Sequence, residues 1–281
     1  MSVRIIIDSA SDITSDRAAK LGVEVLPLKT IFGEEEFLDG VNLSHREFYE
    51  KLIESDVHPT TSQISPYDYE EVFKKVKEAG DTAVCITISS KLSGCYHSAN
   101  IAVDGYEDII TIVDSENVAV GEQLLIELAV QLREEGKSAG EIAGVLETEK
   151  KKVRLIALLD TLEYLRKGGR ISGAAAMAGG ILSIKPVIAI ENGVIATLGK
   201  ARGSKNGQNQ LREYTKKLNI DYSKACILAY TGLSDELLKK YVEDSKEIYE
   251  PFGYELPVST IGSTIGTHAG PGAIAVAFFA K

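Results

Sequence analysis

Short apolar runs alternate with amphipathic stretches through the first half of the chain. The runs are rich in β-branched and aliphatic residues and fall at residues 4–7, 82–88, 108–113 and 153–159. Such runs predict strands, with helices between them. The runs around Val84 and Ile109 are continuously apolar, which is typical of strands covered on both faces. Strands that alternate with helices favour a parallel sheet, so we expect an α/β domain over residues 1–160.

Helix-end signals support this interpretation. Ser65 followed by Pro66 is typical of an N-cap and the first residue of a helix. Ser138 and Glu141 have the spacing of a capping box. Gly136 follows the amphipathic stretch 122–135 as a C-terminal stop.

The pattern changes beyond about residue 160. Asn192-Gly193 separates the runs 186–190 and 194–198, which predicts a type I′ hairpin and therefore antiparallel strands. Helices are expected at 204–218 and 235–249, and strands at 225–230, 254–260 and 273–279. We expect a second, α+β domain over residues 161–281, with the chain crossing between domains near 59–78.

The size and charge of the chain exclude some classes of function. The chain has 281 residues and a formal net charge of −10. A negative chain without a stripe of Lys and Arg is not expected to bind nucleic acid. The first residues lack the apolar stretch of a secretory signal, and no run reaches the length of a spanning helix. We therefore expect a cytoplasmic protein.

Motifs for metal, disulfide and nucleotide chemistry are missing from the sequence. Cys85, Cys95 and Cys226 have no CxxC spacing, and the histidines share no metal-binding spacing, so we expect neither a metal nor a disulfide. GxGxxG and the P-loop pattern do not occur, so no nucleotide cofactor is expected. GxSxG, the strongest signal of a serine hydrolase, is also missing.

Polar turns follow three of the predicted parallel strands, at the edge where ligands bind in such sheets. They are residues 8–12, the loop 89–94, and Asp114-Ser115. We expect Ser93 to cap the next helix and to offer its hydroxyl proton to a ligand, and loop amides there attract anions. A second hydroxyl cluster at 60–63 reinforces this site. Taken alone, each segment is also compatible with ordinary turn chemistry.

Three further side chains are candidates for anion recognition. His268 lies in the glycine-dense segment 266–272, which we expect to be a loop, and could contact an anion or act as a base for Ser93. A loop histidine that only satisfies backbone groups is the alternative. Arg170 and Arg202 suit carboxylate or phosphate, although arginines near helix ends also serve as dipole partners or surface charges.

The motifs also occur together in a particular order. DSASDIT, PTTSQ, SSKLSGCYHSA, Asp114-Ser115, LRKGGRIS, Ser183-Ile184-Lys185-Pro186 and IGTHAGPGA follow one another nearly end to end. In this the chain resembles the DegV family of bacterial fatty-acid-binding proteins, departing from the family pattern at Cys95, Ile64 and Tyr230-Thr231.

The resemblance implies a two-domain α/β protein that holds one long-chain fatty acid in an apolar tunnel between its domains. On matching positions, Thr61 and Ser93 would donate hydrogen bonds to the carboxylate, joined by the Gly94 amide and with His268 beside the head group. Arg170 and Arg202 would meet phosphate or a partner kinase.

The resemblance also implies a carrier rather than an enzyme. A separate fatty acid kinase would phosphorylate the bound carboxylate, giving acyl phosphate for phospholipid synthesis, and transient membrane contact would exchange the lipid. No cofactor besides the bound acid is implied. The alternative is an enzyme for phosphotransfer or hydrolysis of a small molecule, using Ser93 and His268.

Overall fold

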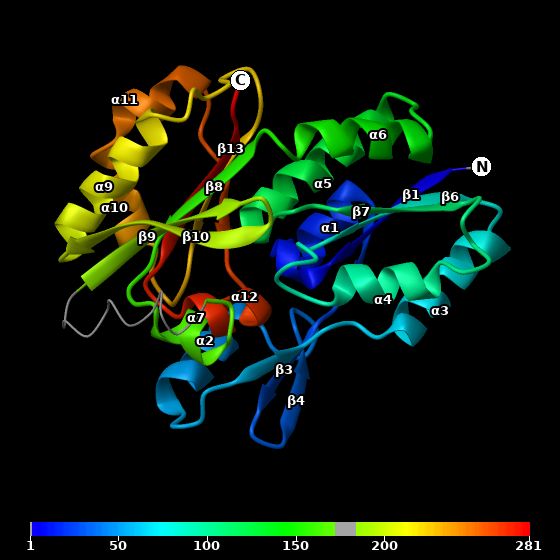
Figure 1. Cartoon of the computed structure of the whole chain (residues 1–281), viewed down its shortest axis with the longest axis horizontal. Helices are drawn as coiled ribbons and strands as arrows, with labels where there is room; N and C mark the ends of the chain where they lie inside the picture. Colours follow the sequence, from blue (N-terminus) through cyan, green and yellow to red (C-terminus); the bar gives the residue numbers. More distant parts are fainter. Residues whose placement is uncertain (1, 172–183) are drawn as a thin grey trace.

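The computed structural model describes residues 2–171 and 184–281, in which two large sheets lie side by side (Figure 1). Ser172 and Ser183, which end and begin two of the motifs quoted above, lie outside these ranges. One sheet is parallel throughout, with the order β2-β1-β6-β7. Its strands are β1 (Val3–Asp8), β2 (Val23–Leu26), β6 (Thr82–Thr87) and β7 (Ile110–Asp114). The α/β prediction is confirmed.

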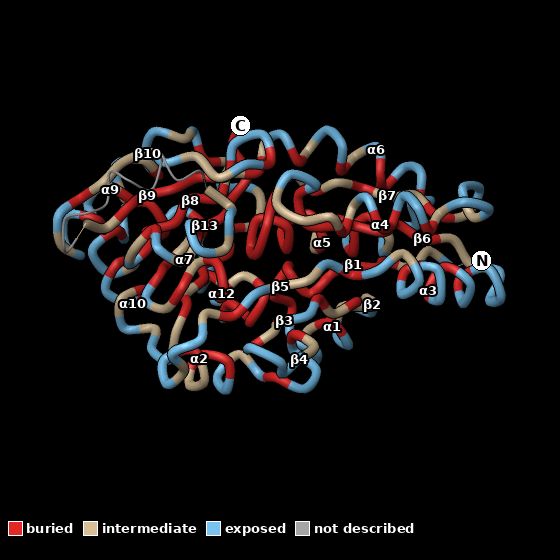
Figure 2. Tube along the Cα trace, turned by 60° about the horizontal axis from the view of Figure 1, so that its bottom comes forward, coloured by how far each residue is buried: buried red, intermediate tan, exposed pale blue. Residues whose placement is uncertain are grey.

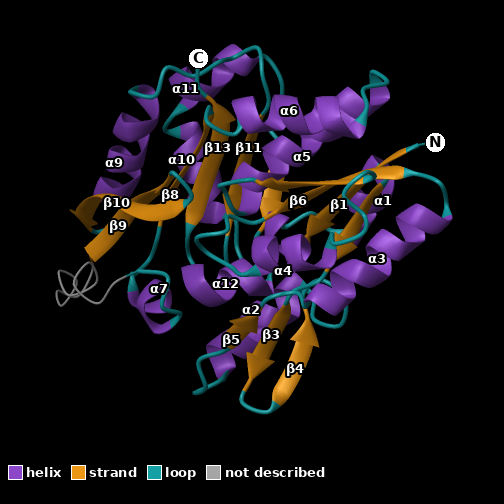
Figure 3. Ribbon diagram, turned by 45° about the vertical axis from the view of Figure 1, so that its right-hand side comes forward, coloured by secondary structure: helices purple, strands orange, loops and turns teal. Residues whose placement is uncertain are grey.

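Helices cover both faces of the parallel sheet. α3 and α4 lie on one side, and α5 and α6 lie on the other (Figures 1 and 3). The helices around this sheet are α1 (Ser15–Leu21), α3 (Pro66–Glu78), α4 (Cys95–Ala102), α5 (Ala119–Glu134) and α6 (Ala139–Glu149), with the short 3-10 helix η1 (Ser9–Ser11). Ser65 is the N-cap of α3 and Ser138 forms the capping box of α6, as predicted, and Ser65 also forms a capping box with Asp68.

The second sheet has six strands in the order β10-β9-β8-β13-β11-β12. They are β8 (Val153–Leu158), β9 (Ile184–Glu191), β10 (Val194–Arg202), β11 (Cys226–Tyr230), β12 (Val258–Thr260) and β13 (Ile274–Phe279). The hairpin prediction is confirmed, because β9 and β10 are antiparallel and Asn192 and Gly193 have φ of 50° and 79°. We propose that the two large sheets are the centres of two domains.

One strand lies in a different sheet from the one expected. The run 153–159 was expected among the parallel strands, yet β8 pairs antiparallel with β9 and β13 of the six-stranded sheet. A continuously apolar run fits either sheet, because both bury their central strands on two faces. The change of sheet therefore comes before residue 153, and not at residue 160.

Two other segments also differ from expectation. The helix predicted over 235–249 is divided into α10 (Glu236–Glu243) and α11 (Lys246–Tyr249), followed by the 3-10 helix η3 (Glu250–Phe252). The segment 266–272 is not wholly a loop, because its first four residues belong to α12 (Ser263–Ala269). Position 266 of this helix needs a glycine, because a Cβ atom there would lie 2.5 Å from the ring of Phe48.

The six-stranded sheet buries different residues on its two faces. Alternate residues of β8 and β9, such as Ile156 and Val187, pack in a core with helices α9 (Ser204–Lys216) and α10. The intervening residues, such as Leu155 and Ile188, belong to the core shared with the parallel sheet and α5. Figure 2 shows buried segments along the strands of both sheets. The face toward α5 also forms one wall of the candidate site.

A smaller antiparallel sheet, in the order β4-β3-β5, completes the described fold. Its strands are β3 (Lys29–Phe32), β4 (Glu35–Leu38) and β5 (Thr60–Ser62), and helices α2 (His45–Glu54) and α7 (Glu163–Lys167) lie nearby (Figure 3). None of the helices in the two described ranges has the length and apolar character needed to cross a membrane.

Candidate functional site: an apolar cavity with a polar end

A cavity of about 440 Å³ lies between the six-stranded sheet and the loops that follow β6 and β7. One wall is the sheet face that carries Leu155, Ile188 and Ile190, and the facing wall includes Leu92 and Val118. This volume falls within the range of small-molecule sites, roughly 300–1,000 Å³.

Small side chains on the central strands leave room for this cavity. Ala157 of β8, Ala229 of β11 and Ala275 of β13 all line it. Ala229 and Ala275 are directly paired between neighbouring strands, and Ala157 faces Ala275 across the next pair. A methyl group at these adjacent positions replaces the larger side chains that would otherwise fill the space. This alanine cluster was not predicted from the sequence, where alternation within each strand is its signal.

Polar groups gather at one end of the cavity. Thr61, Ser93, Gly94, Arg170 and His268 all line it, so the structure brings together five of the six predicted site residues. They come from β5, the β6–α4 loop, the segment after α7, and α12. The Oγ1 atom of Thr61 lies 2.9 Å from Nε2 of His268, across 207 residues of sequence.

His268 is a neutral imidazole in this position. Burial, with the nearby Arg170 charge, lowers its pKa to about 3, because both disfavour the imidazolium. A neutral ring carries one N–H, and Nδ1 is buried without a hydrogen-bond partner in the described structure. If Nε2 carries the proton and donates to Thr61 Oγ1, the threonine hydroxyl keeps its own proton for a ligand.

Gly168 leaves the space that the His268 ring occupies. A Cβ atom on Gly168 would lie 2.0 Å from Nδ1 of His268. The Gly168 backbone has an ordinary φ of −76°, so its role here is to avoid a steric clash and not to adopt an unusual conformation. Gly168, after α7, therefore makes room for the histidine of the site.

Ser93 does not cap the helix as expected. Gly94 is the N-cap residue of α4, and the Ser93 hydroxyl donates a 3.3 Å hydrogen bond to Cys95 Sγ. Thiol sulfur is a weak acceptor, so a carboxylate oxygen would compete well for this proton. Gln63, also on the cavity wall, approaches closely, and a Cβ atom on Gly94 would lie 1.8 Å from its Oε1.

The two predicted arginines occupy different environments. Arg170 lines the cavity, where its Nε donates to the Leu92 carbonyl at 3.1 Å and a terminal nitrogen donates to the Gly168 carbonyl at 2.7 Å. Burial lowers its pKa. Arg202 is exposed at the end of β10 and is not among the residues that line the cavity.

Two of the three polar turns support the cavity loop instead of lining the cavity. Asp8 accepts a 2.8 Å hydrogen bond from the Ile88 amide, and Asp114 accepts one of 3.1 Å from the Ser90 amide. The expected convergence at the strand ends is therefore correct in position, but only the loop 89–94 provides groups that face the cavity.

The fold and site define an α/β protein with an internal cavity for a ligand that is apolar along its length and polar at one end. The sequence model described as "Uncharacterised protein, DegV family" matches residues 2–281. The chain belongs to the DegV family.

Individual relatives cover the whole chain. A DegV domain-containing protein of Caldanaerobacter subterraneus is 34% identical over 285 residues, with 99% of each chain covered. A solved structure of a fatty-acid-binding DegV family protein from Thermus thermophilus has a TM-score of 0.88 at 29% identity and covers 100% of both chains. A stearic-acid-binding protein from Eubacterium ventriosum has a TM-score of 0.87 at 29% identity, covering 100% of this chain and 99% of its own.

Proposed function

We propose that this protein binds one long-chain fatty acid, with the acyl chain in the apolar cavity and the carboxylate at its polar end. The observation that carries the proposal is the Thr61–His268 pair in a cavity whose lining is mostly aliphatic. Two relatives of the same fold that are described as fatty-acid-binding proteins support the ligand class.

Neutral donors hold the carboxylate in this proposal. The hydroxyls of Thr61 and Ser93 and the amide of Gly94 each donate to a carboxylate oxygen, and His268 orients the Thr61 hydroxyl. Hydrogen bonds to an ionised acceptor are shorter and stronger than bonds between neutral groups. The site therefore retains an anion without burying a lysine or arginine in full contact with it, which would require costly desolvation.

We propose that the protein is a carrier that acts in the cytoplasm and presents the carboxylate to a separate fatty acid kinase. The product would be an acyl phosphate for phospholipid synthesis, and transient membrane contact would exchange the lipid. Arg170, at the polar end of the cavity, is suited to the phosphate that forms there. Arg202 is exposed and would contact the kinase.

The enzyme alternative has less support from the geometry. A nucleophile and its base are expected within hydrogen-bonding reach. Ser93 Oγ is bonded to Cys95 and His268 Nε2 to Thr61, and no hydrogen bond joins Ser93 to His268 within the described ranges.

Native mass spectrometry of freshly purified protein tests the proposal, followed by denaturation and identification of the released molecule. We expect a long-chain fatty acid at close to one molecule per chain. Protein that carries no such acid, and that retains no palmitic acid after incubation with it, would contradict fatty-acid binding. A released phosphorylated metabolite would instead favour the enzyme.

A further inference from the structure

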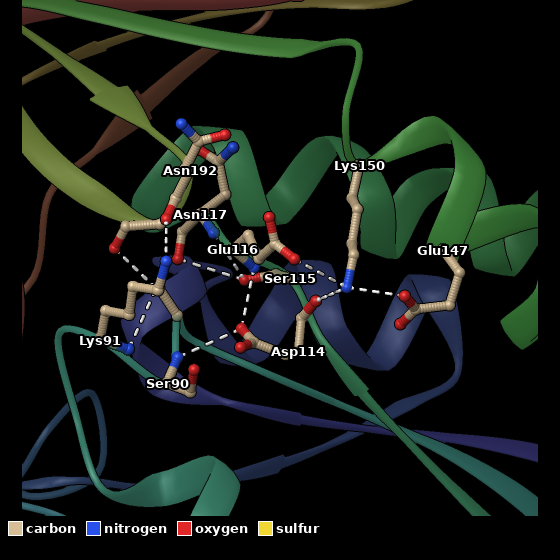
Figure 4. Close-up of polar contacts among 11 residues, drawn as sticks. Ser90, Lys91, Asp114, Ser115, Glu116, Asn117, Glu147, Lys150 and Asn192 are labelled. Atoms are coloured by element: carbon tan, nitrogen blue, oxygen red, sulfur yellow. Dashed lines mark hydrogen bonds and ion pairs between the residues drawn. The ribbon is translucent and has the colours of Figure 1, made fainter.

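The turn of the β9–β10 hairpin is bonded to the loop that follows β6. The Ser89 hydroxyl donates a 2.7 Å hydrogen bond to the Gly193 carbonyl, and Lys91 Nζ donates one of 2.8 Å to the Asn192 carbonyl. Figure 4 shows Lys91 extended toward Asn192. A Cβ atom on Gly193 would lie 2.6 Å from Ser89 Oγ, so the contact requires glycine there. We call these four residues the hairpin latch.

The loop side of the latch is itself firmly held. The Ser89 amide donates to the Asn117 carbonyl at 2.9 Å, and Asp114 holds the Ser90 amide. Lys150, the C-cap residue of α6, in turn donates to the Asp114 carbonyl at 3.0 Å and pairs with Glu116 at 3.2 Å (Figure 4). The Lys150 side chain is only 6% exposed. The latch therefore joins the hairpin to a loop that is itself held in place through Asp114 and Lys150.

The hairpin side of the latch carries part of the cavity wall. Ile190 and Ile195 are paired across the hairpin, close to its turn, and both line the cavity together with Ile188. β10 is an edge strand, hydrogen-bonded only to β9 within the described sheet. On the loop side, Leu92 and Ser93 line the cavity directly after Lys91. The latch thus connects two walls of the cavity, and displacing the hairpin requires both of its hydrogen bonds to break.

We infer that Ser89 and Lys91 are positioning residues that hold the hairpin wall against the ligand and so set how long an acyl chain is retained. The inference rests on the proposed fatty-acid binding. Neither side chain lines the cavity, so both act through the hairpin. The two acceptors are backbone carbonyls, which every substitution preserves, and the strength of the latch therefore depends on the donors at 89 and 91.

Lys91 offers the cleaner test because it is exposed, whereas Ser89 is fully buried. Lys91→Met keeps the long side chain but removes the donor, and Lys91→Arg keeps a donor. Lys239→Met is the matched control, since Lys239 is an exposed lysine of α10 with an ion pair to Asp235 and does not line the cavity.

The measurement is the rate at which radiolabelled palmitic acid leaves the protein for an excess of phosphatidylcholine vesicles. We expect release about three- to tenfold faster from Lys91→Met, the range for losing one hydrogen bond. Lys91→Arg should release palmitic acid at close to the wild-type rate, and Lys239→Met should be unchanged. The thermal unfolding midpoint of ligand-free Lys91→Met should match that of Lys239→Met, which separates the latch from a general loss of stability.

Equal release rates from Lys91→Met and wild-type protein would overturn the inference. If wild-type protein retains no palmitic acid, the proposed function fails first, and hydrogen exchange of ligand-free protein then decides about the latch alone. Faster exchange at residues 188–195 in Lys91→Met than in Lys91→Arg supports the latch, and equal exchange contradicts it.

Discussion

Single residues at the polar end of the cavity come from segments that are far apart in sequence. Thr61 was singled out because hydroxyls cluster around it, and His268 because glycines surround it, but their 2.9 Å contact joins β5 to α12. No local pattern encodes such a pair. The residue types were therefore predictable, whereas their pairing depends on how β5 packs against α12.

Removing the Thr61 hydroxyl should weaken fatty-acid binding. Thr61→Val keeps the size of the side chain but leaves a carboxylate oxygen and His268 Nε2 without this partner. We expect affinity to fall by about 1–3 kcal/mol, the range for leaving a buried polar group unpaired. Isothermal titration with palmitic acid measures the change. Thr148→Val on the exposed face of α6 is the control, and an unchanged affinity in Thr61→Val would place the carboxylate elsewhere.

The same reasoning applies to Ser93, whose hydroxyl donates to the Cys95 thiol. Ser93→Ala gives up a weak hydrogen bond in the free protein and a stronger one in the complex. We expect unfolding of the free protein to change little, while binding of palmitic acid weakens by about 1–3 kcal/mol. Equal losses in the free and bound proteins would indicate a purely structural role.

Gly168 provides a steric test of the histidine position. In Gly168→Ala the new methyl group would overlap His268 Nδ1, so the ring must move and its contact with Thr61 should lengthen or break. We expect weaker binding of palmitic acid and a shifted imidazole signal in the NMR spectrum. Gly140→Ala is the matched control, because nothing lies within 4 Å of a Cβ atom there. An unmoved signal would contradict the proposed packing.

At the scale of elements, local sequence signals predicted helix ends and turns, but they did not predict which sheet each strand joins. Ser65 is the expected N-cap, Ser138 formed the expected capping box, and Asn192-Gly193 formed the expected turn. These features depend on a few adjacent residues. β8 was assigned to the wrong sheet because its partner β13 begins more than a hundred residues later. The resemblance implied an apolar tunnel, but no local pattern predicted the alanine cluster that makes room for the cavity, since Ala157, Ala229 and Ala275 become neighbours only through strand pairing.

The alanine cluster should set the length of chain that fits. In Ala229→Leu the larger side chain projects into the cavity and removes volume from it. We expect the fatty acids that co-purify with this variant to be shorter than those from wild-type protein, as measured by mass spectrometry of the extracted lipid. Ala196→Leu, on β10 and away from the cavity, should leave the lipid profile unchanged. An unchanged profile in Ala229→Leu would contradict the proposed course of the chain.

At the scale of the whole molecule, the interior between the two sheets holds several carboxyl groups. Burial raises the pKa of Asp8 to about 7 and raises those of Asp12 and Glu122 well above their usual range. Both carboxyl oxygens of Glu122 are buried without a hydrogen-bond partner in the described structure. Such groups take up protons on folding, so their contribution to stability decreases as pH rises toward the pKa in the native protein. His268 has the opposite effect on stability, because its pKa is lower in the native protein than in the unfolded chain. It is protonated in the unfolded chain below about pH 6.5, and it therefore destabilises the fold only in acid.

Stability above neutral pH should therefore depend on Glu122. Above neutral pH His268 is neutral in both states. The raised pKa of buried Glu122 favours its protonated form in the native protein relative to the unfolded chain, so that unfolding releases a proton. Each such proton lowers the free energy of unfolding by about 1.4 kcal/mol per pH unit.

Glu122→Gln removes this proton, so its unfolding free energy, measured with urea above neutral pH, should fall less steeply than that of wild-type protein. Asp12 titrates in both proteins, which leaves some dependence in the variant. Glu134→Gln, on the exposed face of the same helix, should keep the wild-type slope. Identical slopes for Glu122→Gln and wild-type protein would mean that Glu122 is already ionised in the native state.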